Sequence, residues 1–340
     1  MTARLEVRIH ASHAQVGAAS RVGAFDVNPL MRVTVVGAGV MGLTCAVRLA
    51  EAGHRVSVVA ATAPAGTTSA VAAALWYPYR ALPAEAVTRW AARSREVFAE
   101  LAGAGGVLLR RGRELLRAPT PEPWWAAAVP DLRRLTSSEL PAGFADGFTF
   151  LAPVVDMGCY LRWLLTRLEA LGVTVAVRRL PSVIEADGDV VVNCTGLGAR
   201  ELVGDTALRP VRGQVVRLAN PGLTDWLLDE ENPAGLTYVV PRIDDVVCGG
   251  TADEGAESTR PDAEVEAGIL RRARALVPAL AQAPILSRAV GLRPGRPAIR
   301  LERDEQRGRP VVHCYGHGGA GVTLSWGCAD DVVALAGSTS

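Results

Sequence analysis

The chain has 340 residues, of which 49% are hydrophobic and 21% are charged, so it is long enough for two domains and too apolar to be intrinsically disordered. Its 36 basic and 35 acidic side chains give a formal charge of +1, which leaves no basic surface for nucleic acid or an anionic membrane. The basic side chains are all arginine, which excludes enzymes that need a Schiff-base lysine or a P-loop lysine.

The first 30 residues show no helical or strand periodicity. They lack the apolar core of a secretory signal and carry Glu6 and Asp26, and a second methionine, Met31, directly precedes the first strand-like run. We predict a disordered leader or an upstream start over residues 1–30 and assign it no function.

A βαβ unit begins at Arg32. A short apolar run leads into Gly37-Ala38-Gly39-Val40-Met41-Gly42, then an apolar-periodic stretch through Ala52, and then a second apolar run over residues 55–59. In this G-x-G-x-x-G pattern the first glycine permits a tight turn, the second lets the backbone approach a pyrophosphate, and the third lets the helix pack on the strand. The complete unit predicts a dinucleotide site, whereas the glycines alone would also suit a structural turn.

The end of the second strand does not identify the dinucleotide. Ala61 stands where an acid would hold the adenosine ribose, and no arginine follows within reach to favour a ribose phosphate. Thr62 or Thr67 could serve the ribose instead.

Residues 67–79 join hydroxyl-bearing and small side chains to a group of aromatic ones. The small residues would let the backbone pass close to a large flat ligand, and Tyr77 could wall a pocket. A buried, alanine-rich turn with core aromatics is the alternative interpretation.

The remaining elements are predicted from apolar spacing and turn residues. Helices are expected over residues 84–101, 161–171 and 264–276, and strands over 189–193, 211–218, 236–241, 245–250 and 310–314.

A glycine-rich loop over residues 316–321 follows the last of these strands and opens an apolar-periodic stretch to Leu335. The positive end of such a helix favours negative charge, such as that on the edge of a reduced flavin. His313 and His317 are four residues apart, which suits a metal on a helix but not at a strand end and a loop, so no metal site is expected.

Arginines held between prolines mark the segment 290–300, which contains Arg293 and Arg296. A rigidly placed guanidinium can pair bidentately with a carboxylate, and an internal ion pair is the alternative.

The six cysteines are scattered and none forms a C-x-x-C pair. This usage is typical of reduced core thiols in a cytoplasmic protein, not of a disulfide framework or a zinc site. No apolar run approaches the roughly 18 residues of a membrane helix, and the C-terminus does not end in a peroxisomal Ser-Lys-Leu signal.

Together these elements predict an α/β fold, in which a Rossmann-like nucleotide-binding domain carries an inserted, mostly antiparallel α+β domain. We assign residues 31–80, 145–205 and 285–336 to the first domain, and residues 81–144 and 206–284 to the second.

The quoted motifs, taken in order, resemble the D-amino-acid oxidase family of FAD enzymes, from Arg32 to about Ala336. The strings that carry the resemblance are Gly37-Ala38-Gly39-Val40-Met41-Gly42-Leu43, Val71-Ala72-Ala73-Ala74-Leu75-Trp76, Val192-Asn193-Cys194-Thr195-Gly196, Gly213-Gln214-Val215-Val216, Tyr238-Val239-Val240-Pro241, Gly291-Leu292-Arg293-Pro294 and Tyr315-Gly316-His317-Gly318-Gly319.

The resemblance implies a site for each part of the reaction. Arg293 stands where the family binds the substrate carboxylate, Tyr238 where a hydroxyl assists it, and Gly319 where a backbone carbonyl accepts from the amino group. Tyr77, from the aromatic group described above, is our further candidate for a substrate contact. The first domain would bind FAD through Gly37, Ala38, Gly39, Val40, Met41, Gly42, Thr68, Ser69, Ala73, Ala74, Leu75, Thr195, Gly318, Gly319, Ala320, Gly321, Val322 and Thr323.

The sequence departs from the family pattern at four places. Ala61 replaces the ribose-binding acid, Ala74 replaces a common glycine, and Ala320 sits where some members have tyrosine. The segment 229–235 is short and lacks the second tyrosine that some members carry on a lid over the active site. We therefore expect a more open entrance to the active site.

The resemblance thus implies an oxidase that converts D-amino acids to 2-oxo acids, ammonia and hydrogen peroxide by hydride transfer to flavin N5. Its partners would be a D-amino acid and oxygen, in the cytoplasm, with a homodimer as a possible assembly. A D-aspartate oxidase would need a second cation, from Arg80 or Arg242, which Asp229, Glu230 and Glu231 would oppose, so neutral or basic side chains are favoured. A glycine or sarcosine oxidase, a nicotinamide-dependent dehydrogenase, and a flavin-binding protein that passes electrons to a partner instead of oxygen are the remaining alternatives.

Overall fold

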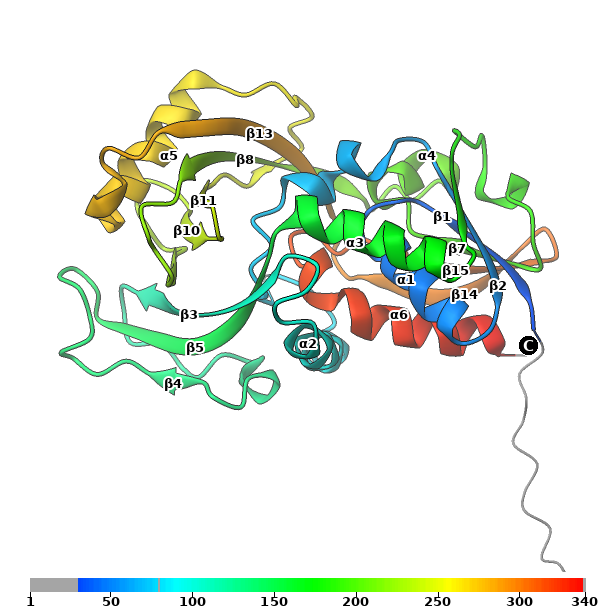
Figure 1. Ribbon diagram of the computed structural model, residues 1–340, viewed down its shortest axis with the longest axis horizontal. Coiled ribbons are helices and arrows are strands. Elements are labelled where there is room, and N and C mark those ends of the chain that lie inside the picture. Colours follow the sequence, from blue (N-terminus) through cyan, green and yellow to red (C-terminus); the bar gives the residue numbers. More distant parts are fainter. Residues whose placement is uncertain (1–29, 79, 339–340) are drawn as a thin grey trace, which may run out of the picture.

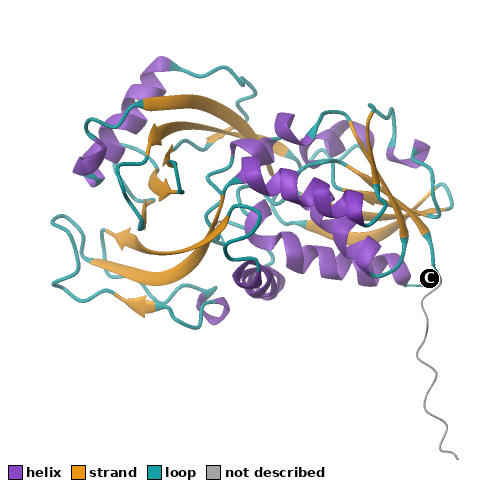
Figure 2. Ribbon diagram, viewed as in Figure 1, coloured by secondary structure: helices purple, strands orange, loops and turns teal. Residues whose placement is uncertain are grey.

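The computed structural model describes residues 30–78 and 80–338, so almost all of the expected leader lies outside the described residues. Two β-sheets form the frame of two lobes (Figure 1). Most of the helices gather around the sheet of one lobe, whereas the other lobe is built largely of strands (Figure 2).

The first sheet has six strands in the order β14-β15-β7-β1-β2-β6. All neighbours in it run parallel except β14 and β15. The strands are β1 (Arg32–Val36), β2 (Arg55–Ala60), β6 (Thr174–Val177), β7 (Val190–Asn193), β14 (Arg300–Gln306) and β15 (Arg309–Tyr315). Four of the five residues of β1 and all four of β7 are buried, because helices and turns cover both faces of a parallel sheet.

Helices α1 (Val40–Glu51), α3 (Met157–Ala170) and α6 (Gly321–Gly337) belong to this lobe, together with the short α4 (Ala199–Leu202). Helix α1 packs against both α3 and α6. Helix α6 is buried over most of its length because it lies between α1 and α2 (Ala84–Glu100). A side chain at Gly327 would meet the backbone of Trp90, so glycine allows the close crossing of α6 and α2.

The second sheet has nine strands. Eight of them follow the order β12-β8-β11-β10-β9-β3-β5-β4, and the ninth, β13, also pairs with β8. Its pairs are antiparallel except β3 with β9. The strands are β3 (Val107–Leu116), β4 (Arg133–Arg134), β5 (Asp146–Val155), β8 (Arg209–Ala219), β9 (Trp226–Asp229), β10 (Thr237–Pro241), β11 (Asp245–Gly249), β12 (Asp253–Glu254) and β13 (Ile285–Gly295).

Helix α5 (Ala263–Leu276) covers one face of the second sheet and closes a separate core with it. It begins where the Asp262 carboxylate accepts hydrogen bonds from the backbone N–H groups of Glu264 and Val265. This N-cap satisfies two donors that the first turn leaves unpaired.

Three segments lie elsewhere than the expected domain boundaries placed them. Strands β5 and β13 belong to the second sheet, although residues 145–205 and 285–336 were assigned to the nucleotide-binding domain. Helix α2, from the segment 81–144 assigned to the other domain, packs against α6 of the first lobe. Local spacing predicts that a segment is a strand or helix, but which sheet it joins depends on pairing with distant residues.

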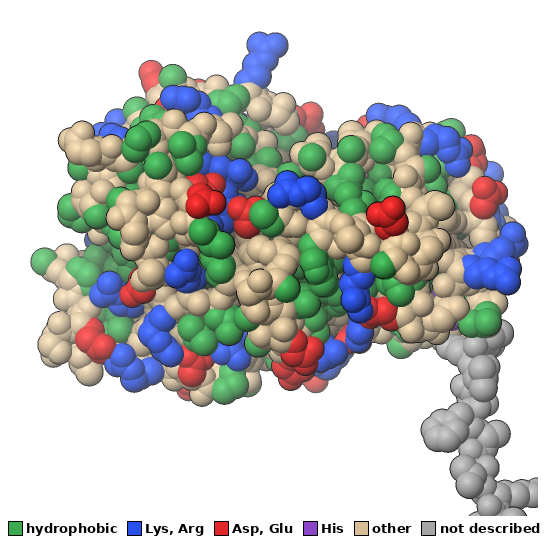
Figure 3. All heavy atoms as spheres, viewed as in Figure 1, with side chains coloured by type: hydrophobic (Ala, Val, Ile, Leu, Met, Phe, Trp, Pro, Cys, Tyr) green, Lys and Arg blue, Asp and Glu red, His purple; other side chains and the backbone are tan. Residues whose placement is uncertain are grey.

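Basic and acidic side chains are intermixed on the face shown in Figure 3, in keeping with the near-equal numbers of the two charges. Among the helices of the described residues, none combines the length and apolar character that a membrane crossing needs.

Candidate active site

A cavity of about 1430 Å³ lies where the first sheet meets the second. The residues that follow the carboxyl ends of β1, β2, β7 and β15 line one part of it, and residues of β8, β9, β10 and β13 line the other. The cavity therefore joins the crevice where α/β sheets bind ligands to the inner face of the second sheet.

The glycine turn after β1 has the geometry that the sequence pattern predicts. Gly37 has φ +117°, and a Cβ there would lie 2.8 Å from the carbonyl carbon of Cys194. A Cβ at Gly42 would lie 2.8 Å from the carbonyl carbon of Gly37, so the helix can approach the turn only without a side chain. At Gly39 the nearest atom to such a Cβ is Ser69 Oγ at 3.1 Å, and this residue lines the cavity.

Two helix N-termini face the cavity. Gly39 is the N-cap of α1 and Ala320 that of α6, and neither offers a side chain to cap the helix. No acidic residue occupies the first turn of either helix. The loop before α6 is tied to the second sheet, since the N–H of Gly318 donates to the Pro294 carbonyl at 2.9 Å. The positive ends of both helices therefore favour negative charge in one cavity.

The expected absence of a nearby arginine beyond Ala61 is wrong. Arg178 and Arg179 line the same end of the cavity as Ala61, because β6 pairs with β2 and carries the chain beside it. The N–H of Arg178 donates to the Ala60 carbonyl at 2.7 Å, and Arg179 forms an exposed ion pair with Glu201 at 2.8 Å. These arginines were missed because more than 100 residues separate them from Ala61.

Arg293 and Tyr238 meet at the other end of the cavity. Arg293 lies on β13, and its Nη1 donates to the Thr251 carbonyl at 2.9 Å. Burial raises the pKa of Tyr238, while the charge of Arg293 and a hydrogen bond from it lower that pKa. The tyrosine is therefore held as a neutral hydroxyl beside the guanidinium.

Glycines make room for both of these side chains. A Cβ at Gly213 would lie 2.5 Å from the guanidinium carbon of Arg293, and one at Gly250 would lie 2.8 Å from the hydroxyl of Tyr238. Gly249 faces Tyr238 directly in the β10–β11 pair, and the tyrosine ring lies over it. Gly213 was quoted as part of a family string, but only the structure shows its contact with Arg293.

Tyr77 lines the cavity and links it to a buried acid. Its hydroxyl donates to Glu114 Oε1 at 2.6 Å, and its ring meets Trp125 edge-on at 5.3 Å between centroids. Burial raises the pKa of Glu114, although the hydrogen bond from Tyr77 lowers it. Glu230 lines the cavity in the same region, and the sequence analysis did not select it as a site residue.

Most of the predicted site residues line the cavity, with three exceptions. Gly42 is turned toward Gly37 within the βαβ unit, and the methyl group of Ala320 is fully buried. Thr323 uses its hydroxyl to bind the backbone of Tyr77, accepting from the N–H at 3.0 Å and donating to the carbonyl at 3.1 Å. These three residues lie behind the lining residues and pack against them.

Arg242 is not placed to supply a second cation to a substrate. It is 1% exposed and outside the cavity lining, and its Nε donates to Asp245 Oδ1 at 2.5 Å. Asp156 Oδ2 lies 3.7 Å from its Nη1. Arg80 is exposed and also lies outside the lining.

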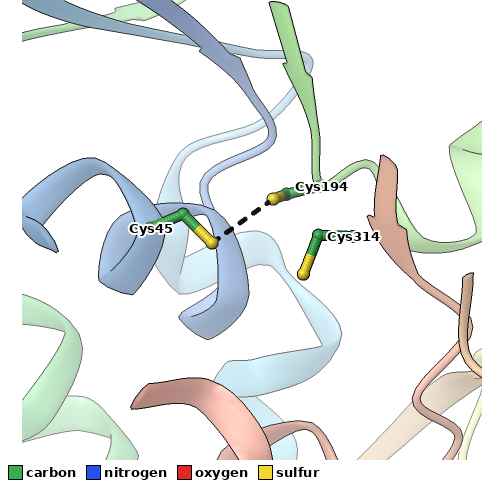
Figure 4. Close-up of side chains that lie close together, drawn as sticks. All are labelled: Cys45, Cys194 and Cys314. Carbon is green, nitrogen blue, oxygen red and sulfur yellow. Dashed lines mark hydrogen bonds between the residues drawn. The ribbon is translucent and has the colours of Figure 1, made fainter. Parts of the chain in front are cut away.

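A group of thiols that the sequence analysis did not anticipate lies behind the glycine turn. Cys45 on α1, Cys194 after β7 and Cys314 on β15 point toward one another, and the Sγ atoms of Cys45 and Cys194 are 3.9 Å apart (Figure 4). Cys314 also lies near His317 and Cys328. The hydrogen bond with Cys194, together with burial, holds the pKa of Cys45 well above its ordinary value. Protonated thiols behave as small apolar side chains, and we interpret the group as core packing.

The two histidines of the strand and loop have different surroundings. His313 lies near Asn193, Gln306 and Asp304, and its pKa is lowered to about 4, chiefly by burial. His317 lines the cavity, and burial lowers its pKa to about 4 as well. Both imidazoles are therefore neutral at pH 7.

Comparisons with known proteins give a consistent result. The family model described as FAD dependent oxidoreductase matches residues 32–335. The chain is 55% identical to the D-amino-acid oxidase of Rubrobacter xylanophilus over 313 residues, which cover 90% of this chain and 96% of that protein. It is 38% identical to the D-aspartate oxidase of Homo sapiens, covering 89% and 94% of the two chains.

The solved structure of glycine oxidase from Bacillus cereus shares the fold. Its TM-score is 0.75 at 20% sequence identity, and the match covers 90% of this chain and 94% of that one. The extent of the family match and the identity to full-length relatives lead to one conclusion: the chain belongs to the FAD dependent oxidoreductase family.

Proposed function

We propose that the chain is a D-amino-acid oxidase, which uses FAD to convert a D-amino acid, oxygen and water into a 2-oxo acid, ammonia and hydrogen peroxide. The observation that carries this proposal is the Arg293–Tyr238 pair at one end of a cavity that two helix N-termini without acidic residues in their first turns face at the other. The D-amino-acid oxidases of Rubrobacter xylanophilus and Streptomyces coelicolor, 55% and 48% identical to the chain, support it.

The residues of the cavity fit FAD. The N-terminus of α1, where Gly39 lines the cavity, suits the pyrophosphate. Thr62, Arg178 and Arg179 border the adenosine end, and the α6 N-terminus suits the electron-rich edge of the flavin ring. When bound, FAD supplies the two-electron acceptor and returns the electrons to oxygen.

The chain's own residues bind and orient the substrate. The Arg293 guanidinium pairs with the α-carboxylate, and the neutral hydroxyl of Tyr238 donates a hydrogen bond to the same group. The Gly319 carbonyl accepts from the α-amino group. Fixing both groups leaves only one hand of amino acid with its α-hydrogen toward the cofactor. Proton loss from the amino group is left to solvent, because burial lowers the pKa of His317 to about 4 and makes its imidazole too weak a base to take that proton.

The visible spectrum of the purified holoenzyme under anaerobic conditions tests the proposal. Addition of D-alanine should bleach the flavin bands, and L-alanine should leave them unchanged. Holoenzyme that resists bleaching by a panel of D-amino acids would refute this function while leaving the family assignment intact.

We also propose that the protein resides in the cytoplasm. All six cysteines are free thiols, and five of them are buried. Reducing compartments keep such thiols reduced. Fractionation of cells that express the native gene at its natural level tests this location.

A further inference from the structure

The carboxylate of Glu230 lies in the substrate end of the cavity. Side chains alternate between the two faces of a strand, so Leu228 near the end of β9 and Glu230 just beyond it point the same way. Both line the cavity, whereas Asp229 between them is 1% exposed and belongs to the other face. Glu230 is therefore part of the pocket wall.

The two acids beside Glu230 have structural partners. Asp229 Oδ2 accepts hydrogen bonds from Arg117 Nη2 at 2.6 Å and from Asn232 Nδ2 at 2.8 Å. Glu231 Oε2 accepts one from the backbone N–H of Arg117 at 3.2 Å. Across the described part of the chain, Glu230 takes part in no such hydrogen bond or ion pair. A half-buried carboxyl group without a partner is costly to ionise, so its place in the cavity points to a ligand.

Glu230 also lies close to the residues that we propose bind the substrate carboxylate, Tyr238 and Arg293. Leu228 faces Tyr238 directly in the β9–β10 pair, so Glu230 is a diagonal neighbour of Tyr238, at roughly 7–8 Å between Cα atoms. Tyr238 in turn contacts Arg293. An amino acid whose carboxylate pairs with Arg293 can thus extend a long side chain toward Glu230.

Charged groups on three segments act on Glu230. Burial and the carboxyl of Glu114 on β3 raise its pKa to about 8, Arg80 before α2 lowers that pKa, and neighbouring Glu231 raises it. Glu114 is itself 9% exposed, and its Oε2 has no hydrogen-bond partner in the described residues. In the empty pocket at neutral pH, Glu230 is mostly protonated, which admits neutral side chains.

We propose that Glu230 is a specificity-determining residue that pairs with the terminal cation of a long, basic D-amino acid such as D-arginine. The inference rests on the proposed function, because it takes Arg293 as the anchor of the α-carboxylate. A carboxylate at the end of the side chain would meet Glu230 and Glu114, and the cation lining this end, Arg293, is already paired with the α-carboxylate.

The test compares D-arginine with D-citrulline, a substrate of nearly the same shape whose side chain carries no charge. In the wild-type enzyme the ratio of kcat/KM for D-arginine over D-citrulline should rise as the pH increases through about 8, because Glu230 gains its charge above its pKa. The D-arginine side chain stays charged throughout, and the α-amino group titrates alike in both substrates. The pH dependence of the ratio therefore reports Glu230.

Glu230→Gln should lower this ratio by roughly tenfold or more and make it independent of pH, the size expected for a partly desolvated charge pair. Its kcat/KM for D-citrulline should change by a smaller factor than that for D-arginine, because the uncharged side chain loses no charge pair. Glu231→Gln, one residue away and exposed, is the matched control. It should reach the wild-type ratio at high pH, with the rise moved to lower pH, because the charge of Glu231 raises the pKa of Glu230.

The outcomes separate this inference from the proposed function. A wild-type ratio near one at every pH, or a ratio that Glu230→Gln leaves unchanged, would overturn the role of Glu230 even if D-alanine is oxidised. The wild-type pH series gives this answer even if the variant fails to fold. Failure of the wild-type holoenzyme to oxidise any D-amino acid would refute the proposed function instead.

Discussion

Replacing Gly213 with alanine should displace the guanidinium of Arg293 while leaving the fold intact. The three atoms nearest to the new methyl group all belong to the end of the Arg293 side chain, with Cζ at 2.5 Å. Such a side chain can move aside, whereas backbone could not. The variant therefore tests whether the position of the guanidinium, and not only its presence, matters for catalysis.

The size of the effect follows from this contact. Carbon atoms in contact lie about 3.5–4.0 Å apart, so the guanidinium must retreat by roughly 1–1.5 Å. Misplacing a positioning group by about 1 Å costs on the order of 100-fold in rate. We expect kcat/KM for D-alanine to fall by about 100-fold, which corresponds to about 2.7 kcal/mol of transition-state stabilisation. Because Gly213 is buried, the free energy of unfolding should fall by about 1–3 kcal/mol, the usual cost of one extra carbon in a packed site.

Initial rates of peroxide formation measure kcat/KM, thermal unfolding measures the change in stability, and the flavin absorbance per chain measures how much FAD is bound. Gly268→Ala on α5 is a matched control, since its methyl group would lie 3.2 Å from Nη1 of another arginine, Arg272, outside the cavity. A folded, FAD-loaded Gly213→Ala enzyme with wild-type kcat/KM would show that the guanidinium position seen here does not determine substrate capture.

Three further predictions concern the cofactor, the anchor and the thiols. Gly39→Ala should leave the melting temperature of the apoprotein near the wild-type value but weaken FAD binding in a fluorescence titration, because its methyl group enters the cavity. Gly42→Ala should lower both the melting temperature and the affinity for FAD, since its methyl group meets the backbone of Gly37. Unchanged FAD affinity in Gly39→Ala would contradict this. Arg293→Ala should cost about 2–5 kcal/mol, measured as a fall of at least about 30-fold in kcat/KM for D-alanine, and a near-normal value would refute its role. A thiol reagent such as DTNB should titrate one cysteine per native chain, Cys159, which is exposed, and the other five only after unfolding; two or more fast thiols would contradict the described burial.

The glycine turn could be predicted from the sequence because its contacts are local. Gly37 and Gly42 constrain one another across five residues, and the pattern of a tight turn and a close helix is encoded within that stretch. The predicted helix over 84–101 differs from α2 by one residue at its end. Helix α3 begins at Met157, four residues before the expected start, because the Asp156 side chain accepts from the N–H of Cys159 and caps it. Such a cap overrides the apolar spacing that the prediction used.

Features that depend on distant pairing could not be predicted. The approach of Arg178 to Ala61 follows from the β2–β6 register, and the thiol group forms because α1, β7 and β15 converge behind one turn. The face that β9 turns toward the cavity could, in contrast, be predicted from local sequence. Alternation along residues 226–230 places Leu228 and Glu230 on one side of the strand. That signal was present in the sequence, but the run of three acids obscured which of them faces the cavity.

The two ends of the cavity are built from different chemistry. The cofactor end relies on backbone N–H groups and on glycines whose replacement would disturb the turn, so its composition is tied to the fold. The substrate end relies on a few side chains, and Glu230 follows a strand end, where its own side chain makes no structural hydrogen bond in the described residues. A change at Glu230 therefore leaves the anchor at Arg293 and the sheet unaltered. We therefore expect that a change at this position alters substrate preference and leaves cofactor binding and stability near their wild-type values. The Glu230→Gln experiment measures the preference, and the flavin absorbance per chain and the melting temperature of the same variant measure the other two.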